Sequence, residues 1–221
     1  MNKNLSSFEK PETASIKETV YQELRRRIIF CEVQPGSLID EKQLIGEFQV
    51  SRTPIREALN SLAEEGLVTI YPRRAIAVAP ITMNDIDNLF EVRSLLEPYI
   101  VRQAVGHVDC DRLVELAENM CESDDIATLA QKDSTFHNYL SSGCRNEVMV
   151  NMLESVFAQT QRMRVAMGRQ CERIPFTRAE HLAIIECIRH RDADGAEQAM
   201  RKHLTAAKMT VMGLYHPVEI V

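Results

Sequence analysis

The stretch from Gly36 to Arg74 constrains the fold more than any other part of the chain. It predicts two short helices joined by a tight corner. Asp40 is a good N-cap for the first helix, and Gln43 three residues later completes a capping box. Ser51 is a good N-cap for the second helix, which ends at Gly66. Two short helices joined in this way are typical of a helix-turn-helix.

The exposed N-terminal end of the second helix carries residues that favour nucleic-acid binding. Arg52, Thr53 and Arg56 lie away from its apolar stripe, and no acidic residue occurs between Glu47 and Glu57. The N-terminus of a recognition helix enters the major groove, where arginine reaches guanine edges or phosphates. The alternative is a solvated amphipathic helix with no role in DNA binding.

Two short strands are predicted next, at residues 67–71 and 75–78, and Leu38-Ile39 can supply a further strand that pairs with them. The turn between the two strands places Arg73 and Arg74 at its tip. These features predict a winged helix-turn-helix whose two arginines point at a minor groove or at the DNA backbone. An ordinary hairpin is the alternative.

The length of 221 residues favours two domains. We expect a flexible segment over residues 1–14, a DNA-binding domain over 15–79 and a second domain over 82–214, with Pro80 at the boundary. The net charge of −6 argues at first against nucleic acid. Residues 1–80, however, hold 11 basic and 11 acidic residues, so the negative charge lies beyond them. A neutral segment with local basic positions suits a specific DNA reader.

From Thr82 onward, the pattern of caps, glycines and prolines predicts only helices, packed as a bundle that Pro98 should kink. The expected helices are 82–106, 109–122, 125–142, 146–169, 175–190 and 192–213.

The six cysteines form no C-x-x-C pair, which favours reduced, partly buried thiols, with redox sensing as the alternative. They are Cys31, Cys110, Cys121, Cys144, Cys171 and Cys187.

No signal peptide is visible, and no apolar stretch approaches the length of a membrane span. We therefore expect a cytoplasmic protein with no membrane partner.

Imidazole and carboxylate side chains form a candidate metal site in the second domain. Asp133 and His137 are four residues apart, so they share one helix face. His181 lies in the fifth helix of this domain and His203 in the last. Three imidazoles and one carboxylate can hold Zn²⁺, Ni²⁺ or a similar divalent ion and leave positions for water or a ligand. On spacing alone, the Asp/His pair is more simply a chance pair. The other histidines are expected at the surface: His107, His190 and His216.

The run S-R-T-P-I-R-E-A-L-x-x-L-x-x-E-G-L-V, which begins at Ser51, resembles the DNA-binding signature of the GntR family of bacterial transcription regulators. The resemblance covers about the first 80 residues of the chain. It implies base and phosphate contacts by the recognition helix, with Arg25 as a backbone contact. The family's wing usually has glycine where this chain has Ala75. The DNA-binding residues expected are Arg25, Ser51, Arg52, Thr53, Arg56, Arg73 and Arg74.

The segment E-V-R-S-L-L-E, Glu91 to Glu97, resembles the opening helix of the FCD effector domain of the FadR branch of these regulators, in its six-helix VanR-like variant. The resemblance implies that Arg93 points into the bundle and pairs with an effector carboxylate. The alternative is a surface pair of Arg93 with Glu97. It also implies that the four positions with metal-binding side chains ligate an ion, with zinc or nickel expected: Asp133, His137, His181 and His203.

The predicted fold is mainly α: a winged helix-turn-helix joined to an all-α helical bundle. We expect a homodimeric regulator, in the repressor class, that binds palindromic operator DNA of a metabolic operon and senses a small carboxylic acid. A metal-dependent enzyme with an accessory DNA-binding domain is the main alternative. The absence of H-E-x-x-H and of a clear general base argues against it. A third hypothesis is an architectural protein that binds DNA without sequence preference, and the net charge of −6 argues against it.

Overall fold

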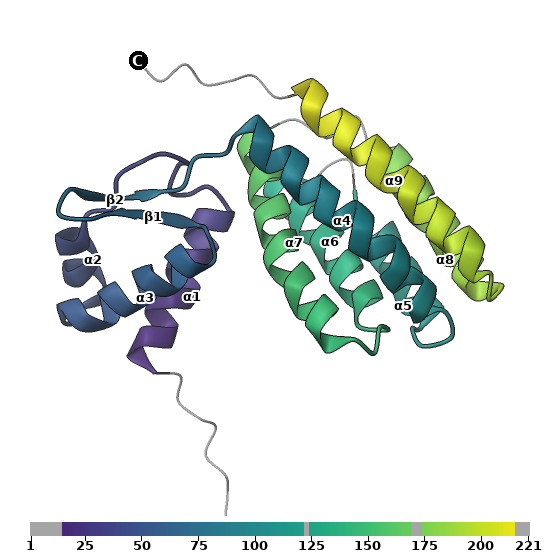
Figure 1. Cartoon of the computed structure of the whole chain (residues 1–221), viewed down its shortest axis with the longest axis horizontal. Coiled ribbons are helices and arrows are strands. Elements are labelled where there is room, and N and C mark those ends of the chain that lie inside the picture. The colour runs from purple at the N-terminus through teal and green to yellow at the C-terminus, as the bar shows by residue number, and fades with distance from the viewer. Residues whose placement is uncertain (1–14, 122–123, 169–173, 215–221) are drawn as a thin grey trace, which may run out of the picture.

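The computed structural model describes residues 15–121, 124–168 and 174–214. The expectations for residues 1–14, Cys171 and His216 fall outside these ranges. Figure 1 shows three helices and a two-stranded sheet at one end of the molecule and a helical bundle at the other. In chain order the elements are α1 (Ile16–Ile29), α2 (Glu41–Phe48), α3 (Arg52–Glu64), β1 (Val68–Tyr71), β2 (Ala75–Val78), α4 (Met83–Ala104), α5 (Cys110–Glu118), α6 (Ile126–Ser141), α7 (Glu147–Met167), α8 (Ile174–Arg189) and α9 (Ala193–Leu214).

The N-terminal helices form the expected helix-turn-helix. The Asp40 carboxylate accepts hydrogen bonds from the backbone N–H groups of Lys42 and Gln43, which fixes the start of α2. Gln49 adopts a left-handed backbone (φ 54°) and makes the corner between α2 and α3. The apolar stripes of α1 and α3 then meet in one core with the strands. Its buried members include Val20, Leu24, Ile28, Ile55, Leu59, Leu62, Val68 and Val78.

The wing is an antiparallel hairpin. Its register runs from Val68 opposite Val78 to Tyr71 opposite Ala75. Leu38 forms a β-bridge to Ala77, so the expected third segment pairs with β2. The turn closes with a hydrogen bond from the Arg74 N–H to the Tyr71 carbonyl.

The bundle consists of α4–α9 within the described residues, and α4 and α8 both pack along α9. Thr82 and Asp85 form a reciprocal capping box at the start of α4, as predicted. That helix continues past Pro98. The α5 helix ends at Glu118, earlier than expected, and the Asn119 carbonyl at its C-cap accepts a hydrogen bond from Lys132.

Within residues 15–121, 124–168 and 174–214, every helix is too short or too polar to cross a lipid bilayer. The cysteines that the structure describes are all free thiols, in agreement with the sequence-based expectation.

Candidate metal centre and DNA-binding surface

Four metal-binding side chains meet at the centre of the bundle. Asp133 and His137 come from α6, His181 from α8 and His203 from α9. All four are at most 2% exposed, and one potential ligand atom from each lies within 4.8 Å of the others. The helices bring these residues together because each lies on an inward stripe that also carries apolar residues, such as Phe136 and Leu204.

The distances between ligand atoms suit a shared ion. The Nε2 atoms of His137 and His203 are 3.2 Å apart. The Nε2 atom of His181 is 3.7 Å from Oδ1 of Asp133. Ligand atoms held about 2.0–2.2 Å from one ion lie roughly 3.0–3.6 Å from one another in octahedral or tetrahedral geometry. Small adjustments of these side chains would therefore complete a coordination shell.

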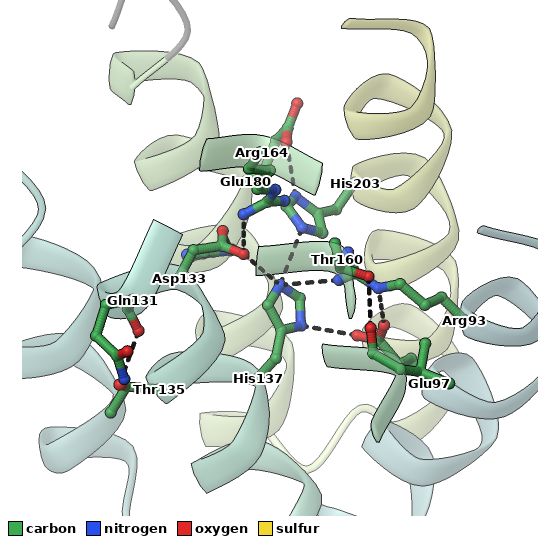
Figure 2. Close-up of polar contacts among 12 residues, drawn as sticks. Arg93, Glu97, Gln131, Asp133, Thr135, His137, Thr160, Arg164, Glu180 and His203 are labelled. Carbon is green, nitrogen blue, oxygen red and sulfur yellow. Dashed lines mark hydrogen bonds and ion pairs between the residues drawn. The ribbon is translucent and has the colours of Figure 1, made fainter. Parts of the chain in front are cut away.

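Two further carboxylates orient the histidine rings (Figure 2). Oε2 of Glu97 lies 2.7 Å from Nδ1 of His137. Oε2 of Glu180 lies 2.8 Å from Nδ1 of His203. The Glu180 contact has hydrogen-bond geometry, whereas the Glu97 contact meets only the distance of an ion pair. A carboxylate beside Nδ1 favours the proton there, which leaves the Nε2 lone pair for the other ligands. When both Nδ1 atoms carry the proton, the two Nε2 lone pairs face each other at 3.2 Å, an arrangement that a cation between them would stabilise.

The His181 ring gives the clearest sign of a missing partner. It is completely buried and stacks on Phe136, with ring centroids 3.9 Å apart. Among the described residues, neither ring nitrogen of His181 has a hydrogen-bond partner, and neither does Oδ1 of Asp133. Buried polar atoms are rarely left unpaired, because each then loses its hydration without compensation. A cation beside Nε2 of His181 and Oδ1 of Asp133 would pair two of these three atoms.

The other oxygen of Asp133, Oδ2, forms an ion pair with Nη1 of Arg164. Burial opposes the charge of Asp133, but the Arg164 guanidinium holds the pKa of the Asp133 carboxyl well below its usual range. Burial, reinforced by the charge of His203, lowers the pKa of His181 well below its usual value. Burial and His137 do the same to the pKa of His203. These shifts favour an ionised Asp133 carboxylate and neutral His181 and His203 rings, the forms that bind metal.

Arg93 lies beside this cluster and is 1% exposed. Its Nε donates to Oε1 of Glu97 at 2.5 Å, and its Nη2 lies 3.4 Å from Nε2 of His137. Burial opposes the charge of Glu97, yet Arg93 and His137 lower the Glu97 pKa to about 2. The alternative prediction, a pair of Arg93 with Glu97 at the protein surface, is therefore wrong about where the pair lies. The pair with Glu97 forms, but it is buried against the metal-binding residues.

Three residues of this site escaped the sequence-based prediction: Glu97 as a histidine partner, Glu180 and Arg164. A signal for Glu97 does exist. The buried stripe of α4 runs through Ile86, Phe90, Arg93, Glu97 and Val101, at helical spacing. The apolar residues before Arg93 and after Glu97 face the bundle. Arg93 and Glu97 lie on the same helical stripe, so they must face the bundle as well.

The predicted DNA-binding residues lie on an exposed surface of the helix-turn-helix. Ser51, Thr53 and the two helix arginines are exposed at the start of α3. The Arg52 and Arg56 Nε atoms lie 3.5 Å and 3.0 Å from the Glu41 carboxylate of α2. Ser51 occupies the N-cap position, but among the residues described its hydroxyl makes no capping hydrogen bond.

The wing arginines face the same region as α3. A cleft of about 460 Å³ is lined by Arg56 on one side and by Arg73, Arg74 and Ala75 on the other. Arg73 adopts a left-handed backbone (φ 59°), which is unusual for a residue other than glycine. Arg25 is placed differently, because its Nε forms an ion pair with Glu65 at 2.8 Å. Its role as a DNA contact stays a prediction.

Comparisons with known proteins identify the family of both parts of the chain. Residues 16–78 match the family model described as bacterial regulatory proteins, gntR family, and residues 88–206 match that of the FCD domain. The chain belongs to the GntR family of bacterial transcription regulators, in the group with an FCD domain. GntR regulators bind operator DNA and act as dimers.

Curated relatives carry the same classification. The HTH-type transcriptional repressor RspR of Escherichia coli (strain K12) is 29% identical over 198 residues, with 87% of each chain covered. The galactonate operon transcriptional repressor of the same organism is 30% identical over 203 residues, which is 80% of this chain and 88% of the relative.

A solved structure shares the fold. A putative GntR transcriptional regulator from Rhodococcus sp. RHA1 superimposes with a TM-score of 0.79 at 22% identity, over 90% of this chain and 99% of that one. The matched families and relatives are transcription regulators, not enzymes, which decides against the metal-dependent enzyme.

Proposed function

We propose that this GntR regulator is a metal-containing repressor that senses a small carboxylic acid. In this proposal residues 15–79 read the operator, and residues 82–214 bind the ion and the effector and form the dimer. The observation that carries the proposal is the buried cluster of Asp133, His137, His181 and His203, with a completely buried imidazole left unpaired.

Zinc or nickel is the ion that these ligands suit best. Three of the four donors are imidazole nitrogens, which favour Zn²⁺ and Ni²⁺ over Mg²⁺ or Ca²⁺, and zinc also accepts a carboxylate oxygen. The carboxylates beside Nδ1 of His137 and His203 would hold those rings in the orientation in which Nε2 faces the ion. Four protein ligands fill a tetrahedral shell but leave positions free in a larger one, where an effector oxygen can bind.

The charges around the cluster favour an anionic effector. Arg93 and Arg164 are balanced by Glu97 and Asp133. A divalent ion adds two positive charges, of which the Glu180 carboxylate on His203 offsets one, so the occupied site stays positive. Among the described residues, Nη1 of Arg93 is also a buried donor without a partner. A carboxylate that bridges the ion and this nitrogen would supply both the charge and the acceptor. The relative that represses the galactonate operon is named for a sugar acid, which supports the same effector class.

An apolar face on α4 and α7 suits a second copy of the chain. Its members are exposed although they are large and apolar, and α4 and α7 pack side by side. They are Leu95, Tyr99, Val148 and Met152. Apolar faces of this kind mark protein–protein contacts. A homodimer through this face would present two recognition helices to the half-sites of a palindromic operator.

The effector class can be tested by thermal unfolding of zinc-loaded protein with a panel of small carboxylic acids. We expect one or more acids to raise Tm, because a ligand at 100 times its Kd stabilises the native state by about 2.7 kcal/mol. The Arg93→Ala variant loaded with zinc should lose this response. Stabilisation that is equal in both proteins, or produced only by neutral compounds, would contradict a carboxylate sensor.

A further inference from the structure

Two faces of α7 contact two different parts of the molecule. Gln159 and Arg162 are three residues apart and share one face, and Gln161 and Arg164 share another. Residues two positions apart, such as Arg162 and Arg164, point in different directions on a helix. Arg164 reaches the metal-binding cluster through Asp133, and Gln161 donates to Gln131 of α6 at 2.8 Å.

The opposite face of α7 holds the DNA-binding part by its backbone. The Nε2 atom of Gln159 donates to the Glu65 carbonyl at 2.8 Å, just beyond the end of α3. Nη2 of Arg162 donates to the Ala79 carbonyl, immediately before the boundary at Pro80. The thiol of Cys31, after α1, lies 3.6 Å from the carbonyl of Arg162. The first two contacts fix the path of the DNA-binding part at two points of its backbone, and in the third a side chain of that part reaches the backbone of α7.

Burial of the Arg162 guanidinium is energetically unfavourable, so its hydrogen bond to Ala79 is sensitive to small shifts. It is 2% exposed, and within the described chain its Nε has no hydrogen-bond partner. A buried guanidinium with one carbonyl acceptor depends strongly on keeping that bond. The contact borders a cleft of about 470 Å³ that is also lined by Pro80, Ile81 and Thr82. The cleft leaves room for the DNA-binding part to move relative to the bundle.

The position of α7 would depend on whether an ion occupies the metal site. Oδ2 of Asp133 is held by Arg164, so an ion would bind Oδ1, which has no hydrogen-bond partner among the described residues. Drawing Asp133 toward an ion moves the acceptor of Arg164. An α-helix transmits such a displacement as a nearly rigid body, so its opposite face moves against Glu65 and Ala79.

We propose that α7 couples the metal site to the DNA-binding head, with Arg162 and Gln159 as the positioning residues that hold the head. The inference rests on the proposed metal site and adds the route by which its state reaches DNA. Metal binding then changes operator affinity through the contacts with Ala79 and Glu65. Removing either side chain would leave both sites intact but unlinked.

The test compares operator affinity with and without Zn²⁺. The probe is a DNA duplex selected from random sequence by the wild-type protein, and the protein is first stripped with a chelator. For wild type we expect Zn²⁺ to change the Kd by about 5-fold or more, the lower end of usual allosteric couplings. The variants Arg162→Ala and Gln159→Ala should bind both zinc and operator, with a change in Kd below about 2-fold. Arg189→Ala, which alters a surface arginine paired with Asp111, should keep the wild-type response.

Two further measurements distinguish a failure of the metal-site proposal from a failure of the coupling through α7. The zinc content of each protein reports the metal site independently of DNA. The rate of amide exchange over residues 79–82 should change with zinc in wild type but not in Gln159→Ala. Gln159→Ala removes only a half-buried side chain, so it can replace Arg162→Ala if that variant does not fold. A wild type that binds zinc with unchanged operator affinity overturns the coupling alone. Variants that keep the wild-type response overturn the role of α7. A wild type that binds no zinc overturns the metal site and, with it, the coupling.

Discussion

Replacing Glu97 with glutamine should destabilise the metal-stripped protein by about 3–5 kcal/mol, the usual cost of removing one partner of a buried ion pair. The size follows from burial: the Arg93 and Glu97 side chains are 1% and 2% exposed. Glutamine keeps the shape and one acceptor oxygen but leaves the Arg93 guanidinium charged and buried without a counter-ion at this position. Urea unfolding followed by far-UV circular dichroism measures the loss.

The chain contains a matched control for this experiment. Glu197 and Arg201 form the same type of pair at the same helical spacing on α9, but the Arg201 side chain is 53% exposed. Glu197→Gln should therefore cost about 0–1 kcal/mol. The double variant Arg93→Met/Glu97→Gln should regain most of the stability that Glu97→Gln loses, because both charges are then absent. A Glu97→Gln cost no larger than that of Glu197→Gln would refute the reasoning.

Three other predictions concern DNA binding, assembly and the metal. Arg56→Ala should weaken operator binding by about 1–3 kcal/mol and random-sequence binding less, as measured by fluorescence anisotropy; an equal loss on both duplexes would remove its role in base recognition. Leu95→Glu should yield monomers in light scattering, because a charge would be buried in the proposed dimer face; a dimeric variant would place the interface elsewhere. Glu180→Gln should lower zinc affinity about 10–100-fold in competition with a chelator, because it removes the carboxylate that orients His203; unchanged affinity would refute that role.

The sequence predicted the DNA-binding part well because its signals are local. Asp40 caps α2, the left-handed Gln49 makes the corner, and the wing strands flank one short turn. Each of these features depends on residues close together in the chain. The contact of Arg25 with Glu65 could not be read in this way, because it joins residues 40 positions apart.

The cluster of Asp133, His137, His181 and His203 was predicted from a different kind of information. The spacing of Asp133 and His137 indicates a shared helix face, but only the family resemblance brought His181 and His203 to the same point. The contacts made by Glu180 and Arg164 depend on how α7, α8 and α9 pack, and helical periodicity does not give that packing. The contact between Arg162 and Ala79 depends likewise on how two parts of the chain meet.

The metal content of the purified protein tests the central claim most directly. Elemental analysis of wild type and of His137→Ala, each stripped and then reconstituted with zinc or nickel, gives the number of ions per chain. We predict about one tightly held ion per chain in wild type and much less metal in the variant, because His137→Ala removes one of the four ligands. Wild-type protein that stays metal-free after reconstitution, or a variant that retains the ion equally well, would contradict the assignment of this cluster as a metal centre.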